Sequence, residues 1–370
     1  MTSSTSLSRH LAIAYIVLLV YACLYPLSGW QSKGLPLFDY LFRPWPKYFM
    51  VEDFIFNIVG FLPFGLTVVP SLSERWPTWK KVLAATVAGT LLSFGVETVQ
   101  CYLPTRTENN VDILANGIGA LLGSLLGARW GKAMFAPGRG LARWREHYIT
   151  GGMTGDTGLI LILYWLLGQI TPDHVLFGGG DLRRLLGIAA PLPFQVNRLI
   201  VIQTAQTASM MLAVGLFARC MLHRKGVQLA VGLLAVGVVA RTLASAALFI
   251  PASPFAWLTP GVQNGLLIGA VLLFVALRMS RVAQHALAGT ALLMAAVLIN
   301  LMPESPYLES SGPAIIARGN YPSFHAMCRL VAALWPFAAL AYLSAIGLWR
   351  GERLADRDHA GEGVPYGTNW

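Results

Sequence analysis

Ten long apolar stretches follow one another along the chain, and short polar segments separate them. A run of about 18 or more predominantly apolar residues is typical of an α-helix that spans a lipid bilayer. The pattern therefore predicts an all-α, polytopic membrane helix bundle of about ten transmembrane helices. The predicted spans are residues 11–27, 53–70, 82–103, 111–128, 157–170, 199–222, 227–250, 262–279, 284–302 and 327–349.

The composition and the placement of charge agree with this pattern. Of the 370 residues, 55% are hydrophobic and 12% are charged, whereas a soluble chain has about 25% charged residues. When the N-terminus is placed in the cytoplasm, 17 of the 27 lysines and arginines fall on the cytoplasmic side and 9 on the outer side. This asymmetry predicts that both termini are cytoplasmic and that the protein is a multi-pass protein of the cell (plasma or inner) membrane.

The net charge of +10 does not call for a nucleic-acid partner, because topology and contact with anionic lipids account for it. We expect membrane lipids as partners, and the sequence gives no indication of oligomeric state.

The four cysteines form no CxxC pair and no cluster with histidine, so the sequence predicts no metal site and no cofactor. A disulfide near the outer face and isolated thiols are both open alternatives. The first span is interpreted as an uncleaved anchor, because YPLS at 25–28 makes a poor cleavage site.

A basic, glycine-containing stretch between Arg129 and Thr150 divides the chain. The sequence RGLARWREH at 139–147 has Arg, Trp and Arg at helical spacing, and it lies either on the cytoplasmic leaflet or in solvent as part of a linker. The predicted parts are a four-span domain at 1–131, a basic cytoplasmic linker at 132–156, a six-span membrane domain at 157–350 and a cytoplasmic tail at 351–370.

Polar side chains gather at the predicted outer ends of the second, third and fourth spans. Glu97 and Gln100 are three residues apart, so they share one helix face. Asp112 and Asn116, four apart, do the same, and Arg106 lies in the short turn between these two pairs. We call the following set the Arg106 cluster: Asn57, Glu97, Gln100, Arg106, Asp112 and Asn116. Structural roles, a kink at the proline and close helix approach at the glycines, are predicted for Gly60, Pro63, Gly65 and Gly119.

The charged groups of the cluster are expected to face one another. A carboxylate in hydrocarbon costs several kcal/mol unless it is paired, so we expect Arg106 to pair with Glu97 or Asp112. The cluster has two interpretations, which the sequence supports about equally. Either it binds a ligand or takes part in catalysis, or it only locks a three-helix hairpin.

The second half offers weaker signals. Arg241 lies within the seventh span, where we expect it to snorkel or to pair with a backbone carbonyl rather than to act on a ligand. The sequence PSFH at 322–325 is similar to the PSGH box of type-2 phosphatidic acid phosphatases, in which the serine binds phosphate. Phe324 replaces the glycine of that box, and its companion boxes are missing, so a lipid phosphatase is not expected.

The first half resembles a known family. The patterns N-x-x-G-F-x-P-F-G at 57–65, E-x-x-Q at 97–100 and D-x-x-x-N-x-x-G at 112–119, with Arg106 between the last two, are similar in order and spacing to the VanZ family of bacterial membrane proteins. The similarity covers roughly residues 40–131. That family is named for a member that gives low-level teicoplanin resistance. The resemblance implies a multi-pass plasma-membrane protein that acts at the cell envelope, and it implies no established reaction.

Two functions from different classes are consistent with this sequence. In the first, a non-enzymatic envelope protein binds a lipid-linked or amphiphilic ligand, such as a lipid-linked glycan or a lipoglycopeptide, through an outer-face polar pocket. Its role would be glycopeptide resistance or exopolysaccharide production. In the second, an enzyme or transporter acts on a lipid-linked phosphate or glycan substrate, with Glu97 as acid/base and Arg106 as anion clamp. The absence of a recognisable nucleophile or metal set in the sequence favours the first function.

Overall fold

The computed structural model describes residues 6–34, 36–45, 51–171, 175–222, 226–248, 254–304 and 321–361, with the backbone alone at 6, 248, 321–322 and 348–361. Part of the predicted tail, residues 362–370, lies outside the described residues. So do four of the basic residues that entered the charge count, namely Lys47, Arg224, Lys225 and Arg318, and the side chains of three more, Arg350, Arg353 and Arg357.

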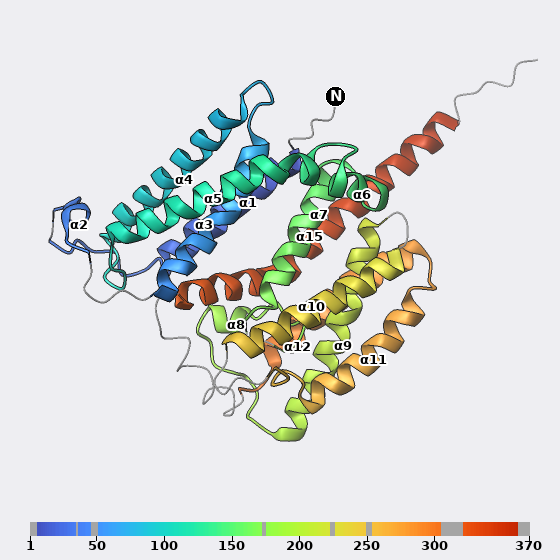
Figure 1. Cartoon of the computed structure of the whole chain (residues 1–370). Helices are drawn as coiled ribbons and strands as arrows, with labels where there is room; N and C mark the ends of the chain where they lie inside the picture. The colour runs from blue at the N-terminus through green and yellow to red at the C-terminus, as the bar shows by residue number, and fades with distance from the viewer. Residues whose placement is uncertain are drawn as a thin grey trace, which may run out of the picture.

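The described residues form α-helices and no named strand, so the predicted all-α class is confirmed (Figure 1). In chain order the helices are α1 (Ser6–Leu24), α2 (Asp39–Phe42), α3 (Val51–Ser71), α4 (Thr78–Gln100), α5 (Asn110–Phe135), α6 (Gly140–Tyr148), α7 (Gly152–Gly168), α8 (Leu182–Leu185), α9 (Val196–Met221), α10 (Gly226–Leu248), α11 (Pro260–Ala276), α12 (Arg281–Leu301) and α15 (Tyr321–Gly361).

Eight helices in the described part of the chain are long and apolar enough to cross a membrane. Two shorter apolar helices, α7 and α11, coincide with the fifth and eighth predicted spans. Each predicted span thus overlaps one described helix, and a polytopic membrane bundle is confirmed. Which face of this bundle lies toward the cytoplasm stays a prediction.

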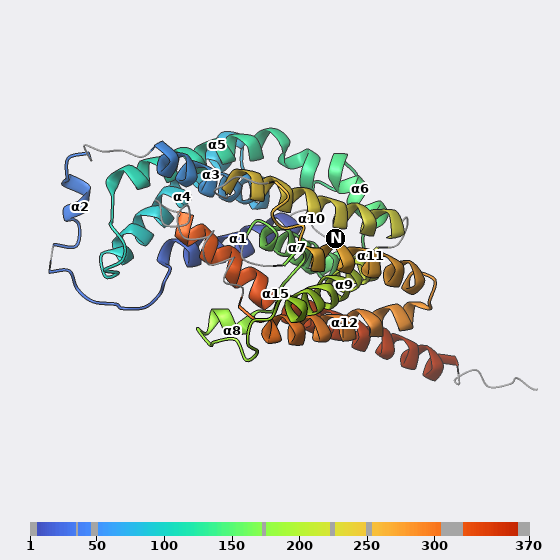
Figure 2. The same cartoon turned by 90° about the horizontal axis from the view of Figure 1, so that it is seen from below.

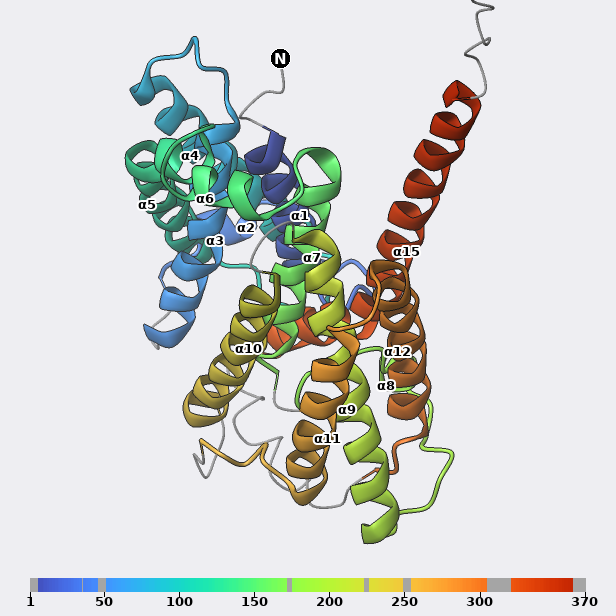
Figure 3. The same ribbon diagram turned by 90° about the vertical axis from the view of Figure 1, so that its right-hand side faces the viewer.

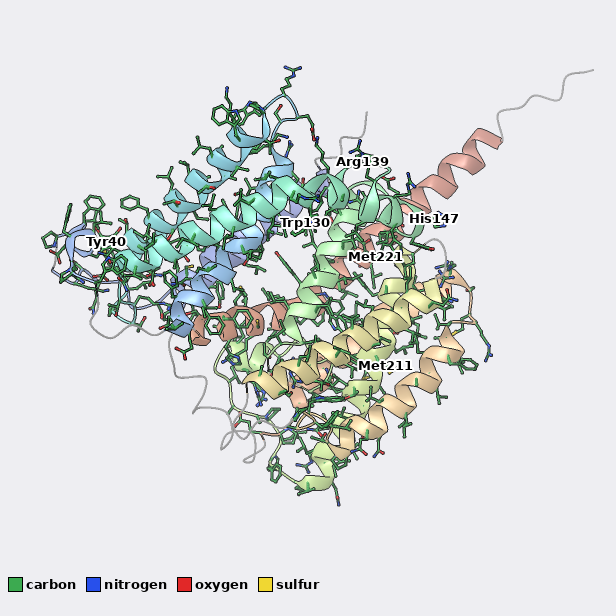
Figure 4. The ribbon with its side chains drawn as sticks, in the orientation of Figure 1. Tyr40, Trp130, Arg139, His147, Met211 and Met221 are labelled. Atoms are coloured by element: carbon green, nitrogen blue, oxygen red, sulfur yellow. The ribbon has the colours of Figure 1, made fainter. Side chains whose placement is uncertain are left out.

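The bundle has two ends that differ in what they carry. The start of α1, helix α6 and the end of α15 lie toward one end, and α2 and α8 lie toward the other (Figure 1). We call them the α6 end and the α2 end. In Figure 4, Tyr40 marks the α2 end, while Arg139 and His147 mark the α6 end. The α4–α5 turn belongs to the α2 end, because the Asn110 side chain donates a hydrogen bond to the Leu41 carbonyl at 3.3 Å.

At the α6 end, one buried carboxylate ties the start of α1 to helices α6 and α7. Asp156 lies 3.0 Å from the Nδ1 atom of His10 and accepts a hydrogen bond from Arg145 at 3.2 Å. Much of the predicted linker at 132–156 is helical, since α5 continues to Phe135 and α6 follows five residues later. The apolar side chain of Trp144 on α6 stays exposed.

In the first half, α3 and α5 touch at backbone level. A Cβ atom on Gly119 of α5 would overlap with the Ile58 carbonyl oxygen of α3, and a Cβ atom on Gly65 of α3 would overlap with the Ala120 carbonyl oxygen of α5. Glycine alone allows helices to approach this closely. A Cβ atom on Gly60 would instead meet open space, so this third glycine is not at a close contact.

The larger hydrophobic core lies in the second half, where α9 contacts α10, α11 and α12. Phe217 of α9 packs edge-on against Trp335 of α15, which in turn contacts Trp165 of α7. Cys220 and Cys328 lie buried in hydrophobic clusters. All four cysteines are free thiols, so the disulfide alternative is not realised.

Helices α1, α7 and α15 join the two halves. Leu18 of α1 and Met327 of α15 belong to one buried hydrophobic cluster, and the Tyr164 hydroxyl of α7 donates to the Ala14 carbonyl of α1 at 3.0 Å. Pro336 inside α15 removes a backbone hydrogen bond, and this helix changes direction along its length (Figure 3). Its first part lies beside the end of α1 (Figures 1 and 2). Helix α15, the last helix in the described part of the chain, therefore reaches the first half.

Candidate functional site

The Arg106 cluster surrounds the turn between α4 and α5 at the α2 end. α5 begins after Asn109, whose side-chain oxygen accepts a hydrogen bond from the Val111 N–H group at 3.0 Å. Asparagine is favoured at this N-cap position because its oxygen satisfies an N–H group that has no partner within the helix. The cap sets where α5 begins, and Arg106 extends from the turn toward α1.

The guanidinium group of Arg106 caps the end of α1. Its Nε atom donates to the Tyr25 carbonyl at 2.9 Å, and its Nη2 atom donates to the Ala22 carbonyl at 3.0 Å. Nη2 also donates to the hydroxyl oxygen of Ser323 in α15. The last carbonyls of a helix have no partner within it and carry partial negative charge, so a cation is favoured there. Burial lowers the pKa of Arg106, although an arginine stays protonated at neutral pH.

The predicted ion pair of Arg106 with Glu97 or Asp112 is wrong, since the described hydrogen bonds of the guanidinium go to carbonyl and hydroxyl oxygens. Both carboxylates are near enough for their charges to act on Arg106. Each of them has another partner, however. Glu97 accepts from the Asn109 N–H group at 3.0 Å, and Asp112 accepts from the Asn57 side-chain amide at 2.8 Å.

The remaining amides of the cluster are engaged inside the bundle. The side chain of Gln100 donates to the Cys23 carbonyl at 2.8 Å and so caps another carbonyl at the end of α1. The side chain of Asn116 donates to the Ser93 hydroxyl at 2.9 Å, and its oxygen atom has no partner among the described residues. The structure thus brings the six predicted residues to one turn, where they form several separate sets of hydrogen bonds.

Glu108, a residue that the sequence analysis did not single out, joins two cations of the preceding loop. Its carboxylate lies 2.6 Å from Lys33 Nζ and 3.4 Å from Arg43 Nη1. Burial raises the pKa of Glu108, but the hydrogen bond from Lys33 and the charges of both cations outweigh it, so this pKa lies below its ordinary value of 4.5. Lys33 also donates to the Arg106 carbonyl at 2.6 Å, which links this ion-pair set to the cluster.

A small pocket opens beside Glu108. Its volume of about 50 Å³ is sufficient for a few water molecules. A second pocket of about 50 Å³ lies near Lys81, toward the α6 end. Neither of these two pockets in the described part of the chain encloses Glu97, Arg106 and Asp112 together. The residues that line the first pocket are Ser32, Lys33, Pro36, Leu37, Tyr40, Cys101, Tyr102 and Glu108.

Two buried arginines of the second half have partners in the protein. Arg241 donates to the Thr171 carbonyl, as expected for an intramembrane arginine that pairs with a backbone carbonyl. Arg183 of α8, for which the sequence suggested no role, donates to Glu304 at 3.1 Å. Its backbone N–H group donates to the Asn300 side chain at 3.0 Å. These contacts tie α8 to the end of α12.

The fold defines the protein as an all-helical, multi-pass membrane protein with a polar turn at one end. Residues 12–130 match the VanZ/LLP1 family. This match confirms the resemblance inferred from residues 40–131 and extends it over α1. The matched segment contains the whole Arg106 cluster, whereas α6 and all later helices lie outside it. No curated protein and no solved structure matched the chain.

Proposed function

We propose that the chain is a non-enzymatic protein of the cell envelope that binds the headgroup of a lipid-linked or amphiphilic ligand at the Arg106 cluster. The candidate ligands are a lipid-linked glycan and a lipoglycopeptide such as teicoplanin, in line with the VanZ-like segment at 12–130. In this proposal the cluster faces the outer side of the cell (plasma or inner) membrane.

The surroundings of Arg106 carry this proposal. Its guanidinium is partly buried and forms no ion pair with a described carboxylate, and its Nη1 atom donates to no described residue. A cation that is partly removed from water is stabilised by an anionic partner. Thr105 and Thr107, on either side of it, are exposed, so a headgroup can approach the turn from the lipid–water interface.

The rival interpretation is the structural lock, because the same hydrogen bonds hold α1 against the α4–α5 turn. The two interpretations differ in what a conservative substitution does. Lysine at position 106 keeps the positive charge, but it lacks the planar fork of N–H groups with which arginine binds an oxyanion at two points. Ligand binding should therefore suffer more than folding.

The experiment compares Arg106→Lys with Arg198→Lys in the full chain. Arg198 lies at the same end, outside the cluster, and donates to the Pro193 carbonyl at 3.0 Å. Folded protein is measured by size-exclusion chromatography of a fluorescent fusion. Activity is measured in the same strain as teicoplanin susceptibility and as polysaccharide output. We expect Arg106→Lys to remain folded and lose activity, and Arg198→Lys to keep both.

Two results would contradict the proposal. One is an Arg106→Lys variant that stays folded and fully active, which would assign the cluster to the structural lock. The other is that neither teicoplanin susceptibility nor polysaccharide output depends on the protein. Should Arg106→Lys fail to fold, Glu97→Gln is the second test, because glutamine keeps an acceptor for the Asn109 N–H group and removes the ionisable carboxyl group.

A further inference from the structure

Helix α15 of the second half contributes a side chain to the surroundings of Arg106. Ser323 is 7% exposed, and its hydroxyl oxygen accepts a hydrogen bond from Arg106 Nη2, 217 residues away in sequence. The first part of α15 lies beside the end of α1 in two views (Figures 1 and 2). Ser323 lies outside the VanZ-like segment at 12–130, so the family match assigns it no role.

The contact leaves hydrogen-bond donors beside a positive charge. A serine hydroxyl that accepts one hydrogen bond still has its own O–H group to donate, and no described residue accepts from Ser323. Arg106 Nη1 likewise donates to no described residue. Two donor groups beside a positive charge favour an anion as the ligand at this place.

Because the turn lies at the end of the membrane-spanning helices, the anions nearest to it are those of lipid headgroups. Lipid headgroups commonly carry phosphate, whose oxygens accept hydrogen bonds from both a guanidinium and a hydroxyl. A phosphate group here would be the headgroup of the ligand in the function proposed above, on which this assignment rests. We infer that Ser323 and Arg106 together bind the phosphate of a lipid headgroup, at a site formed between the two halves of the protein.

The test measures ligand-induced thermal stabilisation of the purified full chain in detergent. The lipid probe is dioctanoyl phosphatidic acid, and inorganic phosphate serves as the probe for a free anion. Ser344 supplies a matched control, because it is an exposed serine on the same helix whose hydroxyl donates to the Leu340 carbonyl at 3.0 Å. The variants are Ser323→Ala, Ser323→Thr, Ser344→Ala and Arg106→Gln, each compared with the unchanged chain.

We expect the lipid probe to stabilise the unchanged chain and Ser344→Ala with equal affinity. Loss of a hydrogen bond to a charged group should weaken binding to Ser323→Ala about tenfold, and Ser323→Thr, which keeps the hydroxyl, should restore it. Inorganic phosphate should bind much more weakly than the lipid. If Ser323 only stabilises the fold, Ser323→Ala should lower the melting temperature without ligand and leave the affinity for the lipid probe unchanged.

The variants and the two probes test different parts of this inference. If Ser323→Ala and the unchanged chain bind the lipid probe with equal affinity, Ser323 is not part of the site. The proposed function would still stand if Arg106→Gln binds the probe more weakly. Equal affinity for both probes would show that the site takes free phosphate and would overturn the lipid assignment. If the unchanged chain binds neither probe, the inference fails, whatever the teicoplanin result for Arg106→Lys.

Discussion

At the scale of the residue, the α4–α5 turn is organised around the carbonyl groups at the end of α1. Gln100 and Arg106 donate to three of these carbonyls, those of Ala22, Cys23 and Tyr25. A carbonyl at a helix end that is removed from water needs a donor from elsewhere in the protein. The first predicted helix is thus held to the third and fourth by polar contacts as well as by apolar packing.

We predict that Arg106→Ala destabilises the folded protein by about 1–3 kcal/mol, because two carbonyls of α1 would lose their donor. Thermal unfolding in detergent measures this change. Arg198→Ala is the control, since Arg198 donates to a single carbonyl in an exposed contact. Equal melting temperatures for the two variants would mean that the Arg106 hydrogen bonds add nothing to stability.

The ion-pair set of Glu108 predicts a dependence of stability on pH. The pKa of Glu108 in the folded protein lies below its ordinary value of 4.5, so the ionised form stabilises the fold. This contribution is present above about pH 4.5 and is lost as the pH falls through the lower, folded-state pKa. We expect Glu108→Gln to lower the melting temperature at pH 7 and to leave it less sensitive to acid. Glu146→Gln, at an exposed carboxylate of the α6 end, should leave the acid sensitivity unchanged.

Helical spacing predicts which side chains share a helix face, such as Glu97 with Gln100 and Asp112 with Asn116. It could not predict their partners. The carbonyls of Ala22 and Tyr25 have no signature in the sequence, and they engage the guanidinium that was expected to pair with Glu97 or Asp112. Glu108 was missed for a similar reason, since its partner Lys33 lies in a distant loop.

At the scale of the element, the contact between α3 and α5 depends on glycines. The positions facing each other are so close that a single Cβ atom on Gly119 or Gly65 would overlap with the backbone of the other helix. Close approach of this kind is a main source of helix association in a membrane, where apolar burial gives little driving force. Helices α3 and α5, which carry Asn57, Asp112 and Asn116 of the cluster, can therefore pack closely because these glycines have no side chain.

We predict that Gly119→Leu prevents stable packing of α3 on α5, because the new side chain would collide with the Ile58 carbonyl. The cost should exceed the roughly 1–3 kcal/mol that is typical of an overpacked core. Gly95→Leu is the matched control on α4, since a Cβ atom there meets nothing within 4 Å. The amount of folded protein in the membrane measures both. Equal amounts of the two variants would contradict the close contact.

The long apolar elements were predictable, because a bilayer-spanning helix needs an apolar run of fixed minimum length. The short helices α2 and α8 were not predicted, and for α6 the sequence indicated only helical spacing at 139–147, since contacts with the rest of the protein support these helices. In α6, for example, Arg145 pairs with Asp156 at 3.2 Å, and Ala142 is buried against the bundle. A window of sequence around residues 139–147 contains the arginines but not these partners.

At the scale of the whole molecule, α1, α7 and α15 connect the VanZ-like segment to the second half. The predicted boundary at 132–156 separates four predicted spans from six along the chain, yet Leu18 of α1 and Met327 of α15 share one buried hydrophobic cluster. Both are apolar residues within predicted spans, so their sequence does not reveal which helix each one contacts. The polar contact between Arg106 and Ser323 lies at the same junction. A ligand at the Arg106 cluster would therefore contact both halves.

The orientation of the bundle gives the final prediction. Alternation of the spans places 17 basic residues on one side and 9 on the other, and the start of α1, helix α6 and the end of α15 lie at the same end of the structure (Figure 1). Positive charge is retained on the cytoplasmic side during insertion, so we expect the α6 end to be cytoplasmic and the Arg106 cluster to face outward.

Reporter fusions after Ala128 and after Arg350 test this orientation, and both should report the cytoplasm. The opposite side is tested in the full chain by a cysteine at position 105, in the exposed turn beside Arg106. The four native cysteines are first replaced, because all of them are free thiols. A reagent that cannot cross the membrane should label Thr105→Cys in intact cells and should not label Ser73→Cys, in the exposed turn between α3 and α4. Labelling of Ser73→Cys alone would show that the bundle has the opposite orientation. The cluster would then face the cytoplasm, where it could not bind a ligand of the outer leaflet.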